Sequence, residues 1–541
     1  MNGGVLADVV DYVVIGSGFG GSVSAMRLTE KGYRVLVLEK GKRYRDEDFA
    51  DTNWKFWKYL WAPILRCHGI MQLTFFHNFG IMHGVGVGGG SLVYANVLEI
   101  PDDRLFDAPA WRELADWGTI LRPHYDTASR MLGAVPNPGE SPSDVVLGAI
   151  AASMGASDTF RPTRVGVFFG ESGVEVPDPY FDGDGPARKG CNQCGGCMVG
   201  CRHNAKNTLV KNYLYFAEKR GAQVLSEVEA IDVRPLPTDQ PDGARYEVVY
   251  RSSIGWPPGP DRKVRTPNVV FSAGVLGTLH LLFRCRDVAC SLPDISPRLG
   301  EMVRTNNEAF TGASSRREDV DYSQGIAISS IFSPDEVTRV EPVRFPAGSS
   351  LMRFLAGPLI GAGGHWSVRL LKVIGQTLRH PHDFLRLAVL PGWARKTTIL
   401  LFMQTEDTSV SLRLGRNFLT LFRQGLVSAP GAGKAIPSQI EVAHWIARDY
   451  AVRTDGVAVG SITEAVAELP LTAHILGGCP IGRDAQSGVV DLDCQLFNYP
   501  GLYVVDTSIM PANPGVNPSL TAAALAEYAM SRIPPKGDLP A

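Results

Sequence analysis

Residues 12–21 read Tyr12-Val13-Val14-Ile15-Gly16-Ser17-Gly18-Phe19-Gly20-Gly21. The first four form a short apolar run, which is typical of a buried strand. The rest matches the pattern G-x-G-x-x-G, with Gly16, Gly18 and Gly21 at the glycine positions. A helix-like stretch follows, and a second apolar run over residues 35–38 ends at Glu39. This order predicts a strand, a tight turn, a helix and a second strand.

The same stretch predicts a binding site for an adenine dinucleotide. Its glycines allow the tight turn and let a pyrophosphate approach the backbone at the N-terminus of a helix. Glu39 stands where an acid would hydrogen-bond a ribose hydroxyl. A glycine triplet alone would indicate only a turn, and the stretch does not distinguish one dinucleotide from another.

The composition is that of an ordinary globular protein. The chain has 541 residues, of which 45% are hydrophobic and 20% are charged, and its net charge is −2. With no basic run, nucleic acid is not an expected partner. We find no secretory signal and no apolar run of the roughly 18 residues that span a bilayer. We therefore expect a cytoplasmic protein, and peripheral contact with a membrane stays open.

A second glycine-rich segment covers Gly84-Val85-Gly86-Val87-Gly88-Gly89-Gly90-Ser91-Leu92. So many glycines in nine residues indicate close approach of the backbone to a flat or anionic group. A flexible loop is the alternative, but the interleaved apolar side chains favour an ordered segment.

Two segments are unusually apolar. Residues 54–61 include Trp54, Phe56, Trp57, Tyr59, Leu60 and Trp61, with two lysines between them. They form either a helix that packs its aromatic face on the core or a lip that touches a membrane or a large apolar substrate. Residues 351–390 are apolar and basic. Their two histidines in His380-Pro381-His382 would make a poor metal site without nearby carboxylates, so this stretch is interpreted as a turn.

Four of the nine cysteines form a cluster. Cys191, Cys194, Cys197 and Cys201 have the C-x2-C-x2-C-x3-C spacing of bacterial-type ferredoxins. No second run exists and Arg202 replaces the proline that usually follows. A [4Fe–4S] cluster, a zinc ion, a local disulfide and idle thiols all stay open. An odd number of cysteines does not suggest a disulfide framework.

The rest of the chain predicts a discontinuous architecture. Residues 223–233 alternate like strands, and residues 269–278 repeat the strand–glycine–helix pattern, so a Rossmann-like domain resumes after an insertion. Residues 140–190 are interpreted as surface loops. Strand-like runs over 325–333, 398–404 and 410–414 predict an antiparallel substrate domain. The expected divisions are 1–110, 205–309 and 461–541 for cofactor binding, 111–204 for the insertion and 310–460 for substrate.

The last 80 residues carry candidate chemistry. His474 lies beside the turn Gly477-Gly478, and an apolar run over 502–505 ends at Asp506. Asn517 and Pro518 have the residue types of an N-cap and a first helical position, before a helix predicted over 521–532.

These motifs, in this order, resemble the glucose–methanol–choline (GMC) oxidoreductase family over nearly the whole chain, with the closest likeness to its cholesterol oxidase-like actinobacterial branch. The resemblance implies an α/β fold, with a Rossmann-like FAD-binding domain and an antiparallel substrate domain, and oxidation of an alcohol. It implies His474 and Asn517 as catalytic residues. It also implies Glu341, in Glu341-Pro342-Val343-Arg344-Phe345-Pro346-Ala347-Gly348, as a proton carrier in double-bond isomerisation.

The resemblance also implies the cofactor contacts. They are Gly16, Gly18, Phe19, Gly20, Glu39, Gly86, Gly90, Ser91, Tyr94, Ala95, Val228, Gly274, Asp506, Asn517, Pro518 and Ser519. Tyr94 replaces an asparagine of better-known cholesterol oxidases, so the flavin environment should differ. Residues 91–96 contain no histidine, which predicts non-covalent FAD.

The expected reaction is hydride transfer from an apolar alcohol to flavin N5. A histidine that titrates near neutral pH can accept the hydroxyl proton. The favoured substrate is the 3-hydroxyl of a sterol or steroid, with 5-ene to 4-ene isomerisation also open. One alternative is a long-chain or terpenoid alcohol dehydrogenase with an iron–sulfur cluster. Another is a redox-neutral isomerase with structural FAD. The electron acceptor is oxygen, or a protein or quinone.

Overall fold

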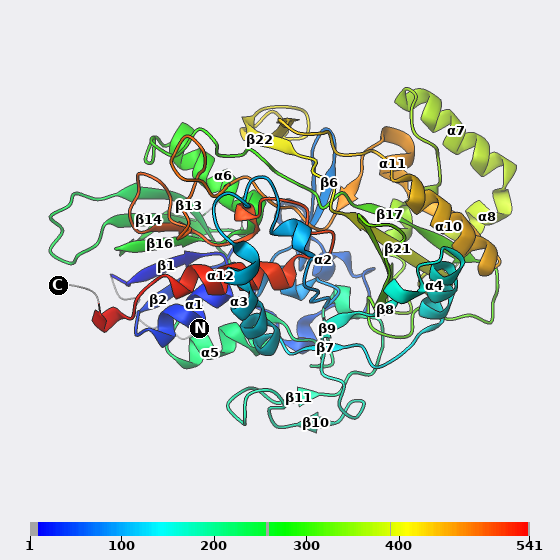
Figure 1. Ribbon diagram of the computed structural model, residues 1–541, viewed down its shortest axis with the longest axis horizontal. Helices are drawn as coiled ribbons and strands as arrows, with labels where there is room; N and C mark the ends of the chain where they lie inside the picture. Colours follow the sequence, from blue (N-terminus) through cyan, green and yellow to red (C-terminus); the bar gives the residue numbers. More distant parts are fainter. Residues whose placement is uncertain (1–8, 256–258, 390, 539–541) are drawn as a thin grey trace.

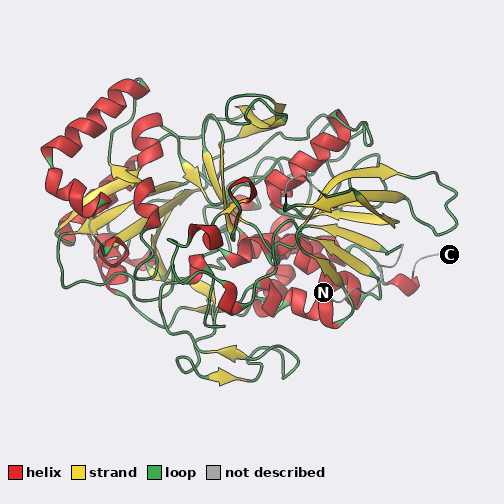
Figure 2. Ribbon diagram, turned by 180° about the vertical axis from the view of Figure 1, so that it is seen from behind, coloured by secondary structure: helices red, strands yellow, loops and turns green. Residues whose placement is uncertain are grey.

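The computed structural model describes residues 9–255, 259–389 and 391–538. It contains a parallel sheet on the left of Figure 1 and a larger antiparallel sheet on the right. Figure 2 shows the same two regions from behind, with most helices at the outside of the sheets. The molecule thus has the predicted α/β character, with parallel and antiparallel sheets built by separate parts of the chain.

The parallel sheet has the strand order β12-β2-β1-β16-β26. Its strands are β12 (Gln223–Leu225), β2 (Val35–Leu38), β1 (Tyr12–Ile15), β16 (Asn268–Phe271) and β26 (Leu502–Val504). Val13 and Val14 of the central strand are fully buried, as expected for a strand covered on both faces. Three distant stretches of the chain therefore build one sheet, which confirms the predicted discontinuous Rossmann-like fold.

Helices and a small sheet cover the parallel sheet. Helices α1 (Phe19–Glu30), α3 (Trp117–Met131), α5 (Tyr213–Lys219) and α12 (Ser519–Ser531) pack together below it in Figure 1. Above it lie α6 (Gly274–Asp287) and the sheet of β13 (Val228–Pro235), β14 (Tyr246–Ser252) and β15 (Arg262–Thr266). Trp111 and Trp117 are buried and stack with ring centroids 4.6 Å apart, so they anchor this layer of the core.

The antiparallel sheet has the strand order β19-β21-β17-β24-β20. Its strands are β19 (Thr338–Val343), β21 (Thr397–Gln404), β17 (Ala309–Ser315), β24 (Gly456–Ser461) and β20 (Ala356–Pro358). Helix α10 (Glu441–Arg453) packs on β17 and β24, and α4 (Pro142–Ser153) packs on α10. The predicted antiparallel region is confirmed, although the run over residues 325–333 forms only the short strand β18 (Ser330–Ile331).

A third sheet lies between the two large ones. It has the order β25-β6-β5, with β5 (Met71–Phe75), β6 (Gly80–Gly84) and β25 (Leu471–Thr472). Because β25 pairs with β6, the segment that carries His474 is attached to the strand that leads into the second glycine-rich segment. Two predicted motifs, almost 400 residues apart, are thereby brought together.

Smaller elements complete the fold. The helices are α2 (Phe56–Tyr59), α7 (Trp366–Arg379), α8 (Pro381–Ala388), α9 (Trp393–Lys396) and α11 (Ile462–Ala467). The short strands are β3 (Trp61–Ala62), β4 (Cys67–His68), β7 (Ala134–Pro136), β8 (Arg161–Pro162), β9 (Arg164–Gly166), β10 (Glu175–Val176), β11 (Arg188–Lys189), β22 (Val410–Gly415) and β23 (Gly425–Pro430). In the described ranges, no helix combines the length and the apolar character needed to cross a bilayer.

Two local predictions need correction, and a third is confirmed. Residues 54–66 do not form one helix with a buried aromatic face, because α2 is a single turn and Trp54, Phe56 and Trp57 are exposed. Residues 140–190 are not loops throughout, because Ser141 caps α4 through Asp144 at its third position and Pro142 begins the helix. Residues 380–382 do mark a turn, where α7 ends and α8 begins.

Candidate active site

A cavity of about 680 Å³ runs from the carboxyl ends of the parallel strands to the edge of the antiparallel sheet. One end is lined by Gly16, Gly18 and Glu39, and the middle by His474 and Asn517. Ligands of open parallel sheets bind in the crevice outside the carboxyl ends of the strands, so this position fits a dinucleotide.

Three helix N-termini border this cavity. Gly18, Ala273 and Pro518 stand at the N-cap positions of α1, α6 and α12, and no side chain caps any of these helices. None of the three has an acidic residue in its first turn. The first N–H groups of a helix lack intrahelical partners and carry partial positive charge. These residues therefore suit a group with a pyrophosphate and a ring that becomes negatively charged on reduction, and FAD fits that description.

The two glycine-rich segments touch where the cavity begins. A Cβ on Gly89 would lie 2.6 Å from Cα of Gly18, and Gly89 has a φ of +52°. Gly16, with a φ of +99°, is packed as closely against the backbone of Ser272. Side chains at these positions would separate the backbones that form the wall of the cavity.

Replacing Gly89 with alanine is expected to weaken FAD binding about 5- to 100-fold, because inserting a methyl group into closed packing costs about 1–3 kcal/mol. Titration of the apoprotein with FAD, followed by fluorescence, measures the change. Gly375→Ala is the matched control, since a Cβ there meets nothing within 4 Å. Equal FAD affinity in the Gly89 and Gly375 variants would contradict the proposed contact between the two glycine-rich segments and the cofactor.

Glu39 joins the two glycine-rich segments. Its buried carboxylate accepts hydrogen bonds from the Ser17 N–H at 3.1 Å, the Ser17 hydroxyl at 2.6 Å and the Gly41 N–H at 2.8 Å, with a longer one from Gly86 at 3.3 Å. Glu39 also lines the cavity, so contact with a ribose hydroxyl stays a prediction. Its contacts show an additional role, which is to fix the turn after β1.

Most of the cofactor contacts implied by the resemblance lie on this cavity. The residues that line it are Gly16, Gly18, Phe19, Gly20, Glu39, Gly90, Tyr94, Ala95, Gly274, Asp506, Asn517, Pro518 and Ser519. Gly86, Ser91 and Val228 are not part of the lining and lie behind it. Ser91 is fully buried and accepts from the Leu209 N–H, while Val228 N–H donates to the Glu39 carbonyl, next to the lining residues Glu229 and Ala230.

Tyr94 is fixed from behind by a buried lysine. Lys206 Nζ lies 4.7 Å from the centre of the Tyr94 ring and donates to the carbonyls of Leu92, Tyr94 and Cys197 at 2.8–3.0 Å. Burial lowers the pKa of Lys206 to about 7. The Tyr94 hydroxyl donates to the Asn207 carbonyl at 2.8 Å. Lys206 thus connects the second glycine-rich segment with the cysteine-containing loop.

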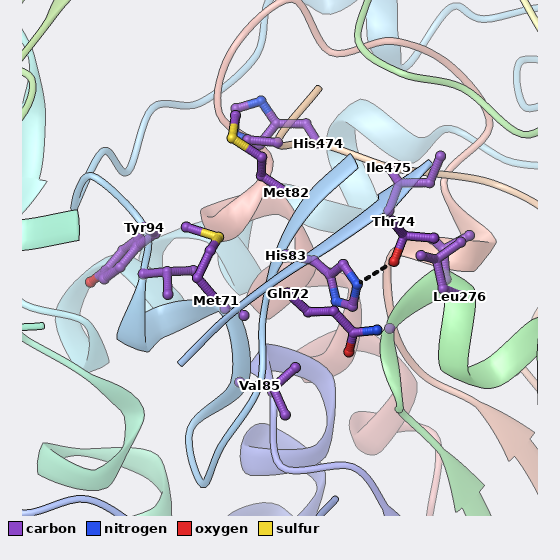
Figure 3. A pocket seen from close by; sticks show the side chains of 18 of the residues that line it. Met71, Gln72, Thr74, Met82, His83, Val85, Tyr94, Leu276, His474 and Ile475 are labelled. Atoms are coloured by element: carbon purple, nitrogen blue, oxygen red, sulfur yellow. Dashed lines mark hydrogen bonds between the residues drawn. The ribbon is translucent and has the colours of Figure 1, made fainter. Parts of the chain in front are cut away.

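The cavity wall between β5 and β6 is shown in Figure 3. His83 Nε2 and the Thr74 hydroxyl form a hydrogen bond of 3.1 Å. Burial lowers the pKa of His83 to about 3. The imidazole is therefore neutral at physiological pH. Met71 and Met82 also lie on this wall, and His474 lines the same cavity.

His474 is positioned by a carboxylate that sequence reasoning did not identify. Its Nδ1 pairs with Glu308 Oε1, and Glu308 Oε2 accepts from the Ala473 N–H at 2.7 Å. The Glu308 side chain is fully buried. The His474 N–H also donates to Thr472 Oγ1 at 2.9 Å. Because Nδ1 is engaged by the carboxylate, Nε2 is the ring nitrogen left to meet a ligand in the cavity.

Asn517 lies between the cavity and Glu341. With its NH2 group facing Glu341, Asn517 donates to the two carboxylate oxygens at 2.8 and 3.2 Å. It precedes the N-cap of α12 by one residue, so the predicted capping role is wrong. Its amide is instead available to Glu341 on one side, and Oδ1 remains as an acceptor.

Glu341 is completely buried in β19 and does not itself line the cavity. Its pKa is raised well above the usual range, first by burial and then by the negative charge of Glu99, while the Asn517 hydrogen bond and Arg161 oppose the shift. Glu99 and Arg161 form a two-pronged ion pair at 2.8 and 2.9 Å. A buried carboxyl with a raised pKa holds its proton more strongly than an exposed one, as a group that carries protons requires.

Asn306 connects the two halves of the site. Its backbone N–H donates to Asn513 Oδ1 at 2.9 Å. Its side chain accepts from the Gly515 N–H at 2.9 Å and donates to the Val516 carbonyl at 3.1 Å. Glu308 follows two residues later. The loop that carries Asn517 is therefore fixed relative to Glu308 and His474.

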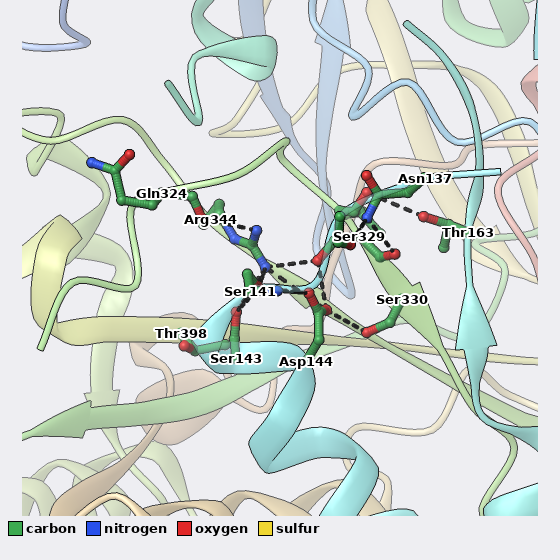
Figure 4. Close-up of polar contacts among 12 residues, drawn as sticks. Asn137, Ser141, Ser143, Asp144, Thr163, Gln324, Ser329, Ser330, Arg344 and Thr398 are labelled. Carbon is green, nitrogen blue, oxygen red and sulfur yellow. Dashed lines mark hydrogen bonds and ion pairs between the residues drawn. The ribbon is translucent and has the colours of Figure 1, made fainter. Parts of the chain in front are cut away.

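The strand that carries Glu341 ends in the buried polar network of Figure 4. Arg344 donates to the hydroxyls of Ser141, Ser143 and Ser329 at 2.7–2.8 Å. Asp144 accepts from the Ser329 and Ser330 hydroxyls at 2.6 Å. The network fixes the end of β19 against the N-terminus of α4, and so restrains the position of Glu341.

The four clustered cysteines do not provide the predicted ligand set. Among the residues that the structure describes, no group of three or more His, Cys, Asp or Glu side chains could hold a metal ion. Burial raises the pKa of Cys191 to about 12 and that of Cys194 to about 11, so both are neutral thiols in this structure. The residues present do not fit a [4Fe–4S] cluster.

Comparison with known proteins adds to this geometry. Residues 407–526 match the family model of GMC oxidoreductases, and residues 14–44 match an NAD(P)-binding Rossmann-like domain. A cholesterol oxidase of Acinetobacter baumannii is 45% identical over 98% of this chain and 95% of its own length. One of Mycobacterium tuberculosis is 44% identical over 98% and 92%. The crystal structure of pyridoxine 4-oxidase from Mesorbium loti shares the fold, with a TM-score of 0.60 at 16% identity over 96% of this chain and 99% of that one.

Proposed function

The chain belongs to the GMC oxidoreductase family as an FAD-dependent oxidoreductase acting on CH–OH groups, and we propose that its substrate is the 3-hydroxyl of a sterol or steroid. The observation that carries the proposal is that His474, paired with Glu308 from behind, lines a cavity whose other part is apolar. Phe345, Trp393, Ile399 and Leu401 belong to that apolar part. The names of the relatives from Acinetobacter baumannii and Mycobacterium tuberculosis point to the same alcohol class.

Bound FAD would supply the acceptor for the hydride that leaves the alcohol carbon. Residues at the three helix N-termini and in the two glycine-rich segments would hold it. His474 accepts the hydroxyl proton at Nε2, because Glu308 occupies Nδ1. Asn517 lines the same cavity and can restrict the orientation of the bound alcohol. The apolar wall excludes water from the reacting carbon.

For Glu341 we propose proton transfer during 5-ene to 4-ene isomerisation of the ketone product. Its ionised form would take a proton from the ring and return it at the far end of the double bond. Asn517 is the group between Glu341 and the cavity, so the carboxyl needs a small movement of that amide to reach the steroid.

Glu341→Gln is expected to separate the two reactions. Isomerisation should fall by about 100-fold or more, because an amide cannot carry the proton, while alcohol oxidation should stay within about tenfold of the unchanged protein. Chromatography of the 5-ene and 4-ene ketones measures the ratio. The exposed Glu171, replaced by glutamine, is the control.

The same ratio should depend on pH. The basic form of Glu341 is lost as the pH falls through its pKa, which lies well above that of an ordinary carboxyl. Isomerisation should therefore decline relative to oxidation at a pH where exposed carboxyls are still ionised. A ratio that is independent of pH, or unchanged in Glu341→Gln, would count against this role.

The proposed substrate is tested by an anaerobic visible spectrum of the purified protein. A 3-hydroxysterol should bleach the flavin faster than a long-chain aliphatic or a terpenoid alcohol at equal concentration. Faster bleaching by the aliphatic or terpenoid alcohol would replace the sterol proposal. No bleaching by any alcohol, with isomerisation retained, would favour a redox-neutral isomerase.

The electron acceptor and the mode of flavin attachment can be measured on the same purified protein. We propose oxygen as the acceptor, and stoichiometric peroxide formation in air would support it. Peroxide well below the amount of ketone would favour a protein or quinone acceptor. We further propose non-covalent FAD, so acid precipitation should release the flavin into the supernatant.

A further inference from the structure

Two buried cations lie behind the second glycine-rich segment. Lys206 and Arg188 are each 2% exposed. Among the described residues their side chains donate to carbonyl and amide oxygens, and neither is part of an ion pair. Buried charges in proteins are normally paired with an opposite charge. The buried arginines elsewhere in the described chain follow that rule, because each has a carboxylate within 4.0 Å: Arg304, Arg344 and Arg369.

Lys206 is placed directly behind the cavity wall. Its Nζ donates to the carbonyls of Leu92 and Tyr94, on either side of Val93, and to a third carbonyl in the cysteine-containing loop. Val93 and Tyr94 line the cavity (Figure 3). An ammonium group has three N–H donors for these three acceptors, whereas a neutral amine would turn a lone pair toward one carbonyl. The contacts of Lys206 therefore favour its charged form.

Arg188 is joined to the same wall through Asn207. Arg188 Nη1 donates to Asn207 Oδ1, and the Asn207 carbonyl accepts from the Tyr94 hydroxyl at 2.8 Å. Arg188 Nη2 is buried and has no hydrogen-bond partner in the described chain. The charge of Asp46 reaches Arg188, but Asp46 is itself paired with Lys211 at 2.6 Å. Tyr94 thus has one cation over its ring and a second behind its hydroxyl. We call Lys206 and Arg188 the buried cation pair.

Hydride transfer changes the charge of the cofactor that this cavity suits. The alcohol carbon gives two electrons and one proton to the flavin as a hydride, and the hydroxyl proton goes to His474. The oxidised flavin ring is neutral, so the reduced ring carries one negative charge. Charge that the protein fixes near the ring is one means by which it tunes a flavin. Solvent and salt screen such charge weakly when it is fully buried.

We propose that the buried cation pair stabilises the reduced, negatively charged flavin, with Lys206 making the larger contribution across Tyr94. Neither cation lines the cavity, so both are positioning residues that act through Tyr94 and through their charge. This role rests on the proposed FAD site but on no particular alcohol, because a flavin can be reduced chemically. It therefore stands or falls separately from sterol oxidation.

The test is the two-electron midpoint potential of the bound flavin, measured by titration with dithionite and a reference dye. The pKa of Lys206 is about 7, so a pH of about 6 keeps the group charged. Lys206→Met removes the charge and keeps an unbranched side chain. The reduced flavin should become about tenfold less stable relative to the oxidised flavin, which corresponds to a potential about 30 mV lower. Affinity for sulfite, which adds negative charge to oxidised flavin, should fall by a similar factor.

Further variants separate charge from packing. Lys206→Arg keeps the charge and should restore most of the potential and of the sulfite affinity. Arg188→Met should shift both in the same direction by a smaller factor, about threefold. The matched control is Lys31→Met, because Lys31 also donates to backbone carbonyls, those of Met530 and Ile533, and does not line the cavity. It should leave the potential unchanged.

The outcomes that would overturn the role of the buried cation pair are distinct. One is a wild-type potential and sulfite affinity in both Lys206→Met and Arg188→Met. Another is an equal shift in Lys206→Met and Lys206→Arg, which would assign the effect to packing against Tyr94. Weaker binding of oxidised FAD with an unchanged potential would leave the pair a structural role alone. Where a Lys206 variant does not retain FAD, Arg188→Met and the charge-keeping Arg188→Lys decide by the same two measurements.

Discussion

Alcohol oxidation is expected to fall by about 100- to 10,000-fold when His474 is replaced by alanine, which is the range for losing a general base. Asn517 and the cavity would still bind and orient the hydroxyl, so kcat should fall much more than KM rises. Rapid-mixing measurement of flavin reduction under anaerobic conditions isolates this step from reoxidation.

His77→Ala is the control for His474→Ala, because His77 is exposed and does not line the cavity. Isomerisation of a supplied 5-ene ketone should survive in His474→Ala, since we assign that proton transfer to Glu341. Flavin reduction at the wild-type rate in His474→Ala would remove His474 from the oxidation step. Loss of bound FAD in the variant would show that the substitution acts through the fold.

Glu308→Gln is expected to lower kcat on the order of 100-fold, although Glu308 does not line the cavity. The carboxylate accepts the Nδ1 proton of His474 and leaves Nε2 as the basic nitrogen. A glutamine that turns its NH2 group toward Nδ1 would favour the opposite tautomer, in which Nε2 carries the proton. Glu308 is thus a positioning residue for His474.

Measurements that a merely structural role would not affect can test Glu308. KM should change little in Glu308→Gln, and the pH dependence of flavin reduction should shift, because the basicity of His474 changes with its partner. Glu308→Asp should restore part of the rate, and the exposed Glu301→Gln should behave as wild type. Equal losses in the aspartate and glutamine variants, with an unchanged pH profile, would argue against positioning of His474.

Short-range patterns were sufficient for the cofactor-binding part of the fold. The apolar runs at 12–15 and 35–38, the glycines between them and the strand–glycine–helix repeat near 270 all form the predicted elements. Each of these depends on neighbours within about 30 residues, and a glycine that must adopt φ > 0 or touch another backbone has few alternatives.

Predictions for the loop-rich and aromatic segments were weaker. Helix α4 was missed because its start, Ser141-Pro142, lies in a stretch rich in Pro, Gly and Asp, although Asp144 completes a capping box. For the aromatic residues at 54–57 a buried helix face and an exposed lip were both open, and burial is wrong because α2 is too short to present one face to the core. Asn517 has the residue type of a cap, yet Glu341 competes for its amide.

Glu308 shows why part of the site needed the structure. It lies in Asn306-Asn307-Glu308, and both asparagines have positive φ, which is a local sign of a special turn. Nothing near it in the sequence connects it with His474, 166 residues away. In the cysteine run, by contrast, the sequence signal was present but the site is not. A spacing that suits a cluster does not by itself make the side chains converge.

The sequence by itself determined the dinucleotide-binding architecture, the discontinuous domain and the candidates His474, Asn517 and Glu341, since these depend on local backbone chemistry and on motifs in a characteristic order. Only the tertiary structure decided the partners of those residues: Glu308 for His474, Glu341 for Asn517, and Asn306 between the two pairs. It also decided that Lys206 lies buried behind Tyr94 and donates to three carbonyls. These outcomes depend on burial and on contacts between distant segments, and such contacts form only when the sheets bring the segments together.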